Sequence, residues 1–114
     1  MLGSGSMDAP PRGSLEKVRS ICLALGGATE TMSFGHPTWR AGRRTFAVFE
    51  KYRGDWSVAL KAEPEQQRAL VASDPRFYPT PYVGQRGWVS FKLRGRIPWA
   101  RLRELLREAH LLAS

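Results

Sequence analysis

The chain has 114 residues, and its 18 lysines and arginines outnumber 10 aspartates and glutamates to give a net charge of +8. This length allows one domain with a single core, and the single cysteine excludes an internal disulfide framework. No apolar run reaches the roughly 18 residues of a membrane-spanning helix, so we expect no membrane partner, and the single cysteine, Cys22, fits a reducing cytoplasm.

The basic charge favours an anionic partner, and nucleic acid is the first such partner to consider. Most of the basic residues are arginines, however, which GC-rich genomes tend to encode in any protein. A charge that serves only solubility is therefore the alternative.

The chain begins with a segment that we do not expect to fold. Residues 1–6 read MLGSGS, which is typical of an expression-tag remnant before a native start at Met7. Residues 7–13 are rich in proline and predict a flexible leader. We expect residues 14–114 to form one domain.

The first predicted helix covers residues 14–25. Its apolar residues recur at the spacing of one buried helix face, and Cys22 belongs to this stripe. A thiol in that position is expected to pack in the core and not to act as a nucleophile.

Four strands are predicted next, and turns separate them. The turns are expected at Gly35–Pro37, Gly42–Arg44 and residues 53–55, between strands at 30–34, 38–41, 45–51 and 56–61. In the third strand, alternation places Phe46 and Val48 on one face and Ala47 and Phe49 on the other.

A second helix is predicted from Pro64 to the residues before Asp74. Residues 74–93, DPRFYPTPYVGQRGWVSFKL, then begin as a rigid proline loop, in which at least one of the Tyr78–Pro79 and Thr80–Pro81 bonds is a candidate for the cis form. The same segment ends as a strand whose residues alternate between Val89, Phe91 and Leu93 on one face and Trp88, Ser90 and Lys92 on the other.

A last amphipathic helix is predicted from Pro98. The order is thus helix, antiparallel strands, helix, one or two strands, and helix. This order predicts a two-layer α+β fold in which the helices cover one face of an antiparallel sheet.

Three stretches, SFGHPTWR, RTFAVF and DPRFYPTPYVGQRGWVSFKL, together resemble the MmcQ/YjbR-like family of small bacterial proteins. The resemblance runs from about Ser14 to the C-terminus, and its most specific pieces are FGHP at 34–37 and PYVGQRGWV at 81–89. It implies a CyaY-like, secretion-chaperone-like fold and DNA binding through a "double wing" of sheet and hairpins. Frataxin-type members of the wider fold bind iron through acidic residues of the first helix, but here Glu16 stands beside Lys17 and Arg19.

Sequence motifs for catalysis and metal binding are lacking. The chain has two histidines, His36 and His110, far apart in sequence, and no CxxC, HExxH or phosphate-loop motif. We therefore expect a protein that is not an enzyme and that uses no metal or cofactor.

The candidate site combines aromatic residues, which can stack on bases, with basic residues, which can hold phosphates. The predicted nucleic-acid-binding residues are Trp39, Arg40, Arg43, Arg44, Arg86, Trp88 and Lys92. The structural alternative is that Tyr78, Tyr82 and Trp88 close one end of the core.

Two other functions remain open. The Trp88 face of the sheet is a candidate surface for a protein or peptide partner or for a homodimer. A pocket for a small ligand under the proline loop would involve His36, Tyr78 and Tyr82.

Overall fold

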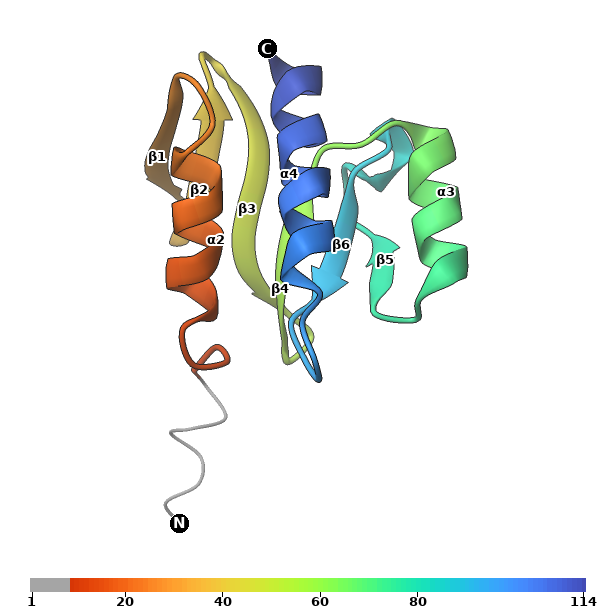
Figure 1. Ribbon diagram of the computed structural model, residues 1–114. Helices are drawn as coiled ribbons and strands as arrows, with labels where there is room; N and C mark the ends of the chain where they lie inside the picture. Colours follow the sequence, from red (N-terminus) through yellow and green to blue (C-terminus); the bar gives the residue numbers. More distant parts are fainter. Residues whose placement is uncertain (1–8) are drawn as a thin grey trace.

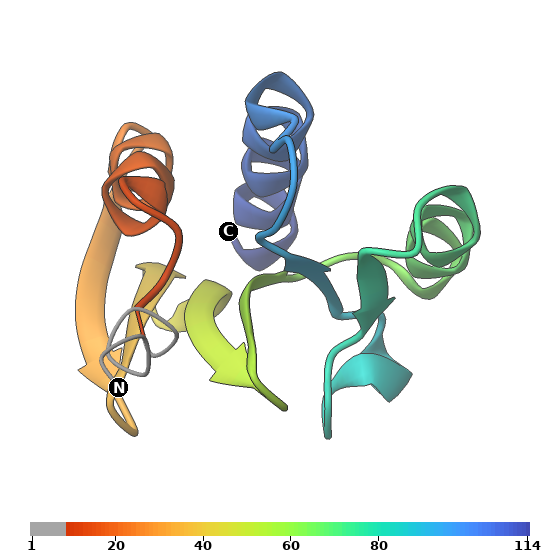
Figure 2. The ribbon, with the colours of Figure 1, turned by 90° about the horizontal axis from the view of Figure 1, so that it is seen from below.

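The computed structural model describes residues 9–114, in which six strands form one antiparallel sheet and three helices cover one face of it (Figures 1 and 2). This arrangement confirms the predicted two-layer α+β fold. The predicted tag remnant lies outside the described residues, as do the first two residues of the predicted leader.

The helices are α2 (Ser14–Leu23), α3 (Pro64–Ser73) and α4 (Trp99–Ala113). The strands are β1 (Ala28–Ser33), β2 (His36–Ala41), β3 (Arg44–Tyr52), β4 (Asp55–Leu60), β5 (Phe77–Pro79) and β6 (Val89–Lys92), and a 3-10 turn, η1 (Gly84–Arg86), precedes β6. They follow the order β1-β2-β3-β4-β6-β5 across the sheet.

Two-residue turns join β1 to β2 and β3 to β4. Phe34 and Gly35 have φ of +52° and +81°, and Arg53 and Gly54 have φ of +52° and +87°. Positive φ at both turn residues matches the right-handed twist of the paired strands. The first turn is therefore shorter than predicted, and His36 already belongs to β2.

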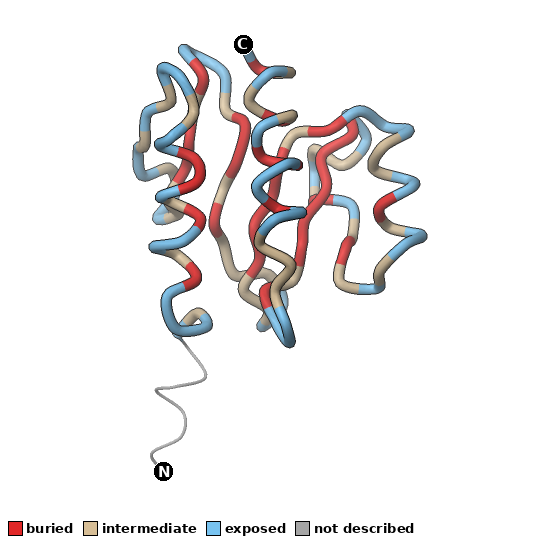
Figure 3. Tube along the Cα trace, in the orientation of Figure 1, coloured by how far each residue is buried: buried red, intermediate tan, exposed pale blue. Residues whose placement is uncertain are grey.

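The core lies between the sheet and the helices, where buried residues line the facing sides of both layers (Figure 3). Val89, Phe91 and Leu93 point into it, which confirms the predicted alternation along β6. Cys22 is fully buried among these residues, and burial raises the pKa of its thiol, as expected for a packing role.

A β-bulge changes the predicted faces of β3. Trp39 lies opposite Ala47, but the next residue, Arg40, lies opposite Thr45, so Phe46 is an extra residue in β3. Phe46 and Ala47 are both buried in the core, and the Phe46 ring meets the His110 ring of α4 edge-on at a centroid distance of 5.2 Å. The prediction that Phe46 shares a face with Val48 is wrong for this reason.

The proline segment contains a strand where the sequence predicts a loop. In β5, Phe77 pairs with Phe91 and Pro79 with Val89. A proline fits there because β5 is an edge strand, where a missing N–H breaks no ladder. No peptide bond in residues 9–114 is cis, so the expectation of a cis bond at Tyr78–Pro79 or Thr80–Pro81 is wrong.

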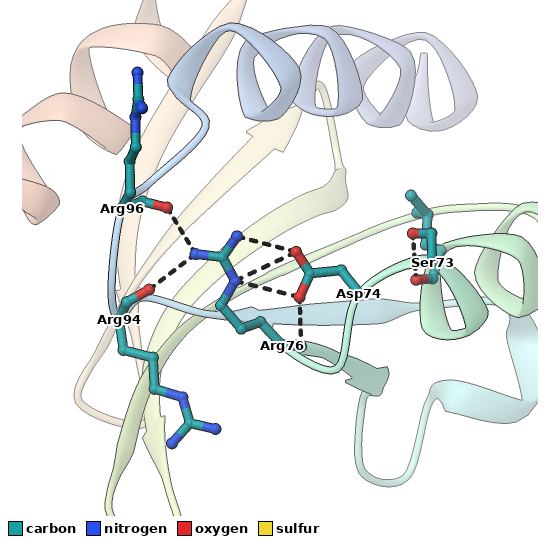
Figure 4. A network of polar contacts seen from close by, with 6 residues as sticks. Ser73, Asp74, Arg76, Arg94 and Arg96 are labelled. Carbon is teal, nitrogen blue, oxygen red and sulfur yellow. Dashed lines mark hydrogen bonds and ion pairs between the residues drawn. The ribbon is translucent and has the colours of Figure 1, made fainter.

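Arg76 fixes the start of this segment against the turn after β6 (Figure 4). Its guanidinium donates to the Asp74 carboxylate at 3.0 Å and to the carbonyls of Arg94 and Arg96 at 3.0 and 2.7 Å. The hydrogen bonds that Arg76 donates to the Asp74 carboxylate hold the pKa of Asp74 below its usual value. The β5 edge is therefore anchored at one end by a side chain that packs over the Phe91 ring.

Candidate nucleic-acid interface

Within residues 9–114, no helix covers the second face of the sheet, and this open face lies between two extensions of the chain (Figure 2). One extension is the β1–β2 hairpin, and the other is the segment that contains η1. Both extend away from the helix layer, so the open face is bordered on two sides.

A hollow of about 570 Å³ opens on this face beside η1. Strand residues form one side of it, and the segment between β5 and β6 forms the other. Its lining residues are Arg44, Thr45, Val48, Glu50, Ala59, Lys61, Thr80, Pro81, Val83, Arg86 and Trp88.

Paired hydroxyl groups allow the sheet beside the hollow to be both polar and buried. Thr80 and Ser90 share a hydrogen bond of 2.9 Å, and the Tyr78 hydroxyl donates to Ser57 at 3.0 Å. Ser57 and Ser90 have no exposed surface, yet their hydroxyls have partners, which removes the penalty for burying them. Burial also raises the pKa of Tyr78.

Gln67 of α3 holds the wall of the hollow in place. Its side-chain amide donates to the carbonyls of Gly84 and Trp88, at 2.7 Å each. Trp88 keeps only 8% of its surface exposed, and it lines the hollow. The wall is thus a rigid part of the fold and not a free loop.

Three cations surround the hollow, and they come from different parts of the chain. Arg44 begins β3, Lys61 follows β4, and Arg86 ends η1. None of the three forms an ion pair with a carboxylate of residues 9–114. Their charges are therefore available to an anionic ligand.

Glu50 of β3 lines the same hollow and is half-buried. Its carboxylate has no hydrogen bond or ion pair to any residue that the structure describes. Burial raises the pKa of Glu50, and the nearby His36 opposes this rise only in part.

Replacing Glu50 with glutamine is expected to raise the melting temperature at pH 7. Because the folded-state pKa of Glu50 lies above its unfolded-state value, the stability that Glu50 contributes is greatest at low pH and is lost as pH rises through the folded-state pKa. Glu50→Gln removes that loss. Thermal melts at several pH values check this, and a gain that does not shrink toward pH 4 would contradict it.

The structure brings together three of the seven predicted nucleic-acid-binding residues. Arg44, Arg86 and Trp88 line one hollow. Arg43 is exposed in the turn beside Arg44. Arg40 lies on the open face, where its Nε is buried and no described residue accepts a hydrogen bond from it.

The other two predicted residues lie elsewhere. Trp39 has no exposed surface and packs in the core, so the prediction that it contacts nucleic acid is wrong. Adjacent residues of a strand point to opposite faces, so Trp39 and Arg40 do not share a surface. Lys92 lies at the far end of β6, where its Nζ is 3.7 Å from the Asp55 carboxylate and near the Tyr78 ring.

The three residues predicted to form a pocket under the proline loop line three separate hollows. His36 lies beside Trp56, Tyr78 beside Tyr52, and Tyr82 on the outside of the proline segment. Tyr82 is 96% exposed, with a φ of +71° that bulky residues rarely adopt. Its shallow hollow shares Thr80 and Pro81 with the larger one.

Sequence reasoning missed Glu50, Lys61 and Thr80 as members of the site. Alternation along β3 places Glu50 on the same face as Val48, and the pairing of Glu50 with Ser57 places both on the open face. The alternation along β3 could have been read from the sequence, but the pairing of β3 with β4 could not.

Two further features bear on the class of site. Within residues 9–114, no three His, Cys, Asp or Glu side chains gather as a group that could hold a metal ion. In the same residues, no helix is both long and apolar enough to cross a membrane.

Comparison with known proteins identifies the family. A sequence model of the YjbR family matches residues 23–112. The fold is similar to the crystal structure of the Deinococcus radiodurans protein DR2400, a DUF419-domain protein, with a TM-score of 0.74, 27% sequence identity, and coverage of 86% of this chain and 76% of that one. No curated protein sequence matches the chain. Because the family match spans most of the chain and includes both the FGHP and the PYVGQRGWV segments, this protein belongs to the YjbR family, as its sequence resemblance predicted.

Proposed function

We propose that this protein is a cytoplasmic, non-enzymatic domain that binds single-stranded nucleic acid, such as single-stranded DNA, on the open face of its sheet. One observation carries the proposal: Arg44, Lys61 and Arg86, none of them paired with a described carboxylate, surround one hollow that Trp88 also lines. A groove that joins cations to an aromatic side chain is the usual arrangement for single strands.

The shape of the hollow favours an unpaired base over a duplex. Trp88 lines the hollow and keeps only a small part of its surface exposed. A base within a duplex is stacked and paired and cannot enter such a space, whereas a single strand can turn a base into it. The cations at the rim would then hold the flanking phosphates.

Tyr82 supplies an exposed stacking surface next to the hollow. Its ring is almost fully exposed, and its shallow hollow adjoins the larger one through Thr80 and Pro81. Left-handed backbone at a bulky residue costs free energy, and such strain often marks a functional position. The base that follows the one in the hollow would stack there, and stacking of this kind contributes about 1–3 kcal/mol per base.

Salt dependence tests the phosphate contacts. With three contacts to a single strand, log K is expected to fall with log salt at a slope of about −2. Replacing Arg44 and Arg86 together with glutamine should flatten this slope by about 1.4. Fluorescence anisotropy with a labelled nine-residue oligothymidylate, dT9, measures both slopes.

A matched control separates the hollow from the overall charge. Arg101 and Arg103 are exposed on α4, on the helix side of the molecule, and neither has an ion pair to a described residue. Arg101→Gln with Arg103→Gln removes the same charge and should leave the slope nearly unchanged. If both double variants weaken binding equally, or if the wild type does not bind at low salt, the proposal is wrong.

A further inference from the structure

Glu50 lines the hollow but has no role in the proposed binding of phosphates. Its carboxylate lines the hollow together with Arg44 and Lys61, yet it pairs with neither of them. A half-buried carboxylate to which no described residue donates a hydrogen bond costs free energy, so a hollow lined by Glu50 and by three cations suits a ligand that presents both hydrogen-bond donors and an anionic group.

The chemistry of a carboxylate limits what the ligand can present to it. An ionised carboxylate only accepts hydrogen bonds, and its two oxygens suit two parallel donors on one flat edge. Among the nucleobases, guanine offers two adjacent donors, N1–H and the N2 amino group. Adenine and cytosine place an acceptor beside their amino group, and thymine places carbonyls on both sides of its single N–H.

We propose that the hollow takes a guanine nucleotide, with Glu50 accepting hydrogen bonds from guanine N1–H and N2–H while Arg44, Lys61 and Arg86 hold the phosphate. This proposal rests on the proposed binding of single strands and names the base that the hollow prefers.

The surroundings of Glu50 strengthen such a pair. Burial makes the empty carboxylate costly in its charged form, so two donors from a ligand satisfy it where water does so poorly. Pro81 and Val83 line the hollow with apolar surface that can contact the faces of a flat base.

A series of oligonucleotides tests the preference directly. Each is an oligothymidylate of nine residues whose central base is guanine, adenine or hypoxanthine, which has N1–H but lacks the N2 amino group. A bidentate pair discriminates by about tenfold, so we expect the guanine strand to bind about tenfold more tightly than the adenine strand. The hypoxanthine strand should lie between them.

Variants assign the preference to one carboxylate. Glu50→Gln should bring the ratio of guanine to adenine affinities close to one, because the amide cannot accept from both donors. Glu65→Gln, which removes an exposed carboxylate of α3 outside the hollow, should keep the full ratio. Thermal melts establish that both variants are folded.

The outcomes separate this proposal from the proposed function. If the wild type binds dT9 but binds the guanine strand and the adenine strand equally tightly, single-strand binding stands and the guanine site is overturned. A guanine preference that survives in Glu50→Gln also overturns the guanine site.

Calorimetry with free GMP and AMP identifies the source of the ligand. If GMP binds more tightly than AMP while no strand binds, the guanine site stands and single-strand binding is overturned. If neither strands nor free nucleotides bind, both proposals are wrong.

Discussion

Replacing Gly87 with alanine is expected to cost about 3 kcal/mol of stability or more. Gly87 has a φ of +106°, and a Cβ on it would lie 2.2 Å from the carbonyl oxygen of Ala62 and 2.9 Å from the backbone of Pro64. These neighbours are backbone atoms of the β4–α3 connection and cannot rotate away. The wall of the hollow must therefore move, so single-strand binding should weaken along with stability.

Gly54→Ala is the control for Gly87→Ala. Gly54 also has a positive φ, +87°, but no atom lies within 4 Å of the position that a Cβ on it would take. This variant carries the backbone strain alone and should cost about 1 kcal/mol. Urea unfolding of both variants measures the difference, and equal losses would mean that residue 87 is not packed against the β4–α3 connection.

Replacing Trp39 with alanine is expected to cost about 4 kcal/mol, a large part of the stability of a small domain. Trp39 has no exposed surface, and its Nε1–H donates to the Glu30 carboxylate at 3.0 Å. The same carboxylate accepts from Arg19 of α2 at 2.8 Å, a bond that lowers the pKa of Glu30. Trp39 thus fills the core and also completes a link between α2, β1 and β2.

Trp39→Phe separates these two roles, because it keeps most of the ring volume and removes the hydrogen bond. We expect it to cost about 1–2 kcal/mol, less than half of the alanine effect. Denaturant unfolding with an unchanged m-value checks both losses. A Trp39→Ala variant as stable as the wild type would place this side chain at the surface, where the sequence had suggested it.

Local sequence patterns predicted most of the fold. The apolar stripe around Cys22 and the alternation from Trp88 to Leu93 each place side chains where the structure has them. In both cases the pattern predicts which side of a single helix or strand is buried, and residues close together in the sequence are enough to predict this.

The errors in the fold came from pairing between strands, which local patterns do not contain. The bulge opposite Trp39 changes the face of Phe46, and it is a property of two strands together. β5 escaped prediction because its prolines argue against a strand unless the strand is known to lie at the edge.

The candidate site was predictable only in part, for a similar reason. Arg44, Arg86 and Trp88 were identified by residue type, but their meeting in one hollow depends on the crossover that sets β6 beside β4. Glu50 was missed because a lone carboxylate in a strand carries no signal until its neighbours are known. Trp39 was included because an aromatic residue beside an arginine resembles a binding motif even when the two face opposite sides.

The most direct test of single-strand binding in this hollow uses the indole N–H signals of the four tryptophans in a ¹⁵N-labelled sample. Trp88 lines the hollow, whereas Trp39 and Trp99 pack on the helix side of the sheet. On titration with dT9, we predict that the Trp88 indole signal shifts, together with the amide signals of Gly84 and Gly87, while the indole signals of Trp39 and Trp99 stay in place. A Trp88 signal that does not move while amides of α4 shift would contradict the proposed interface.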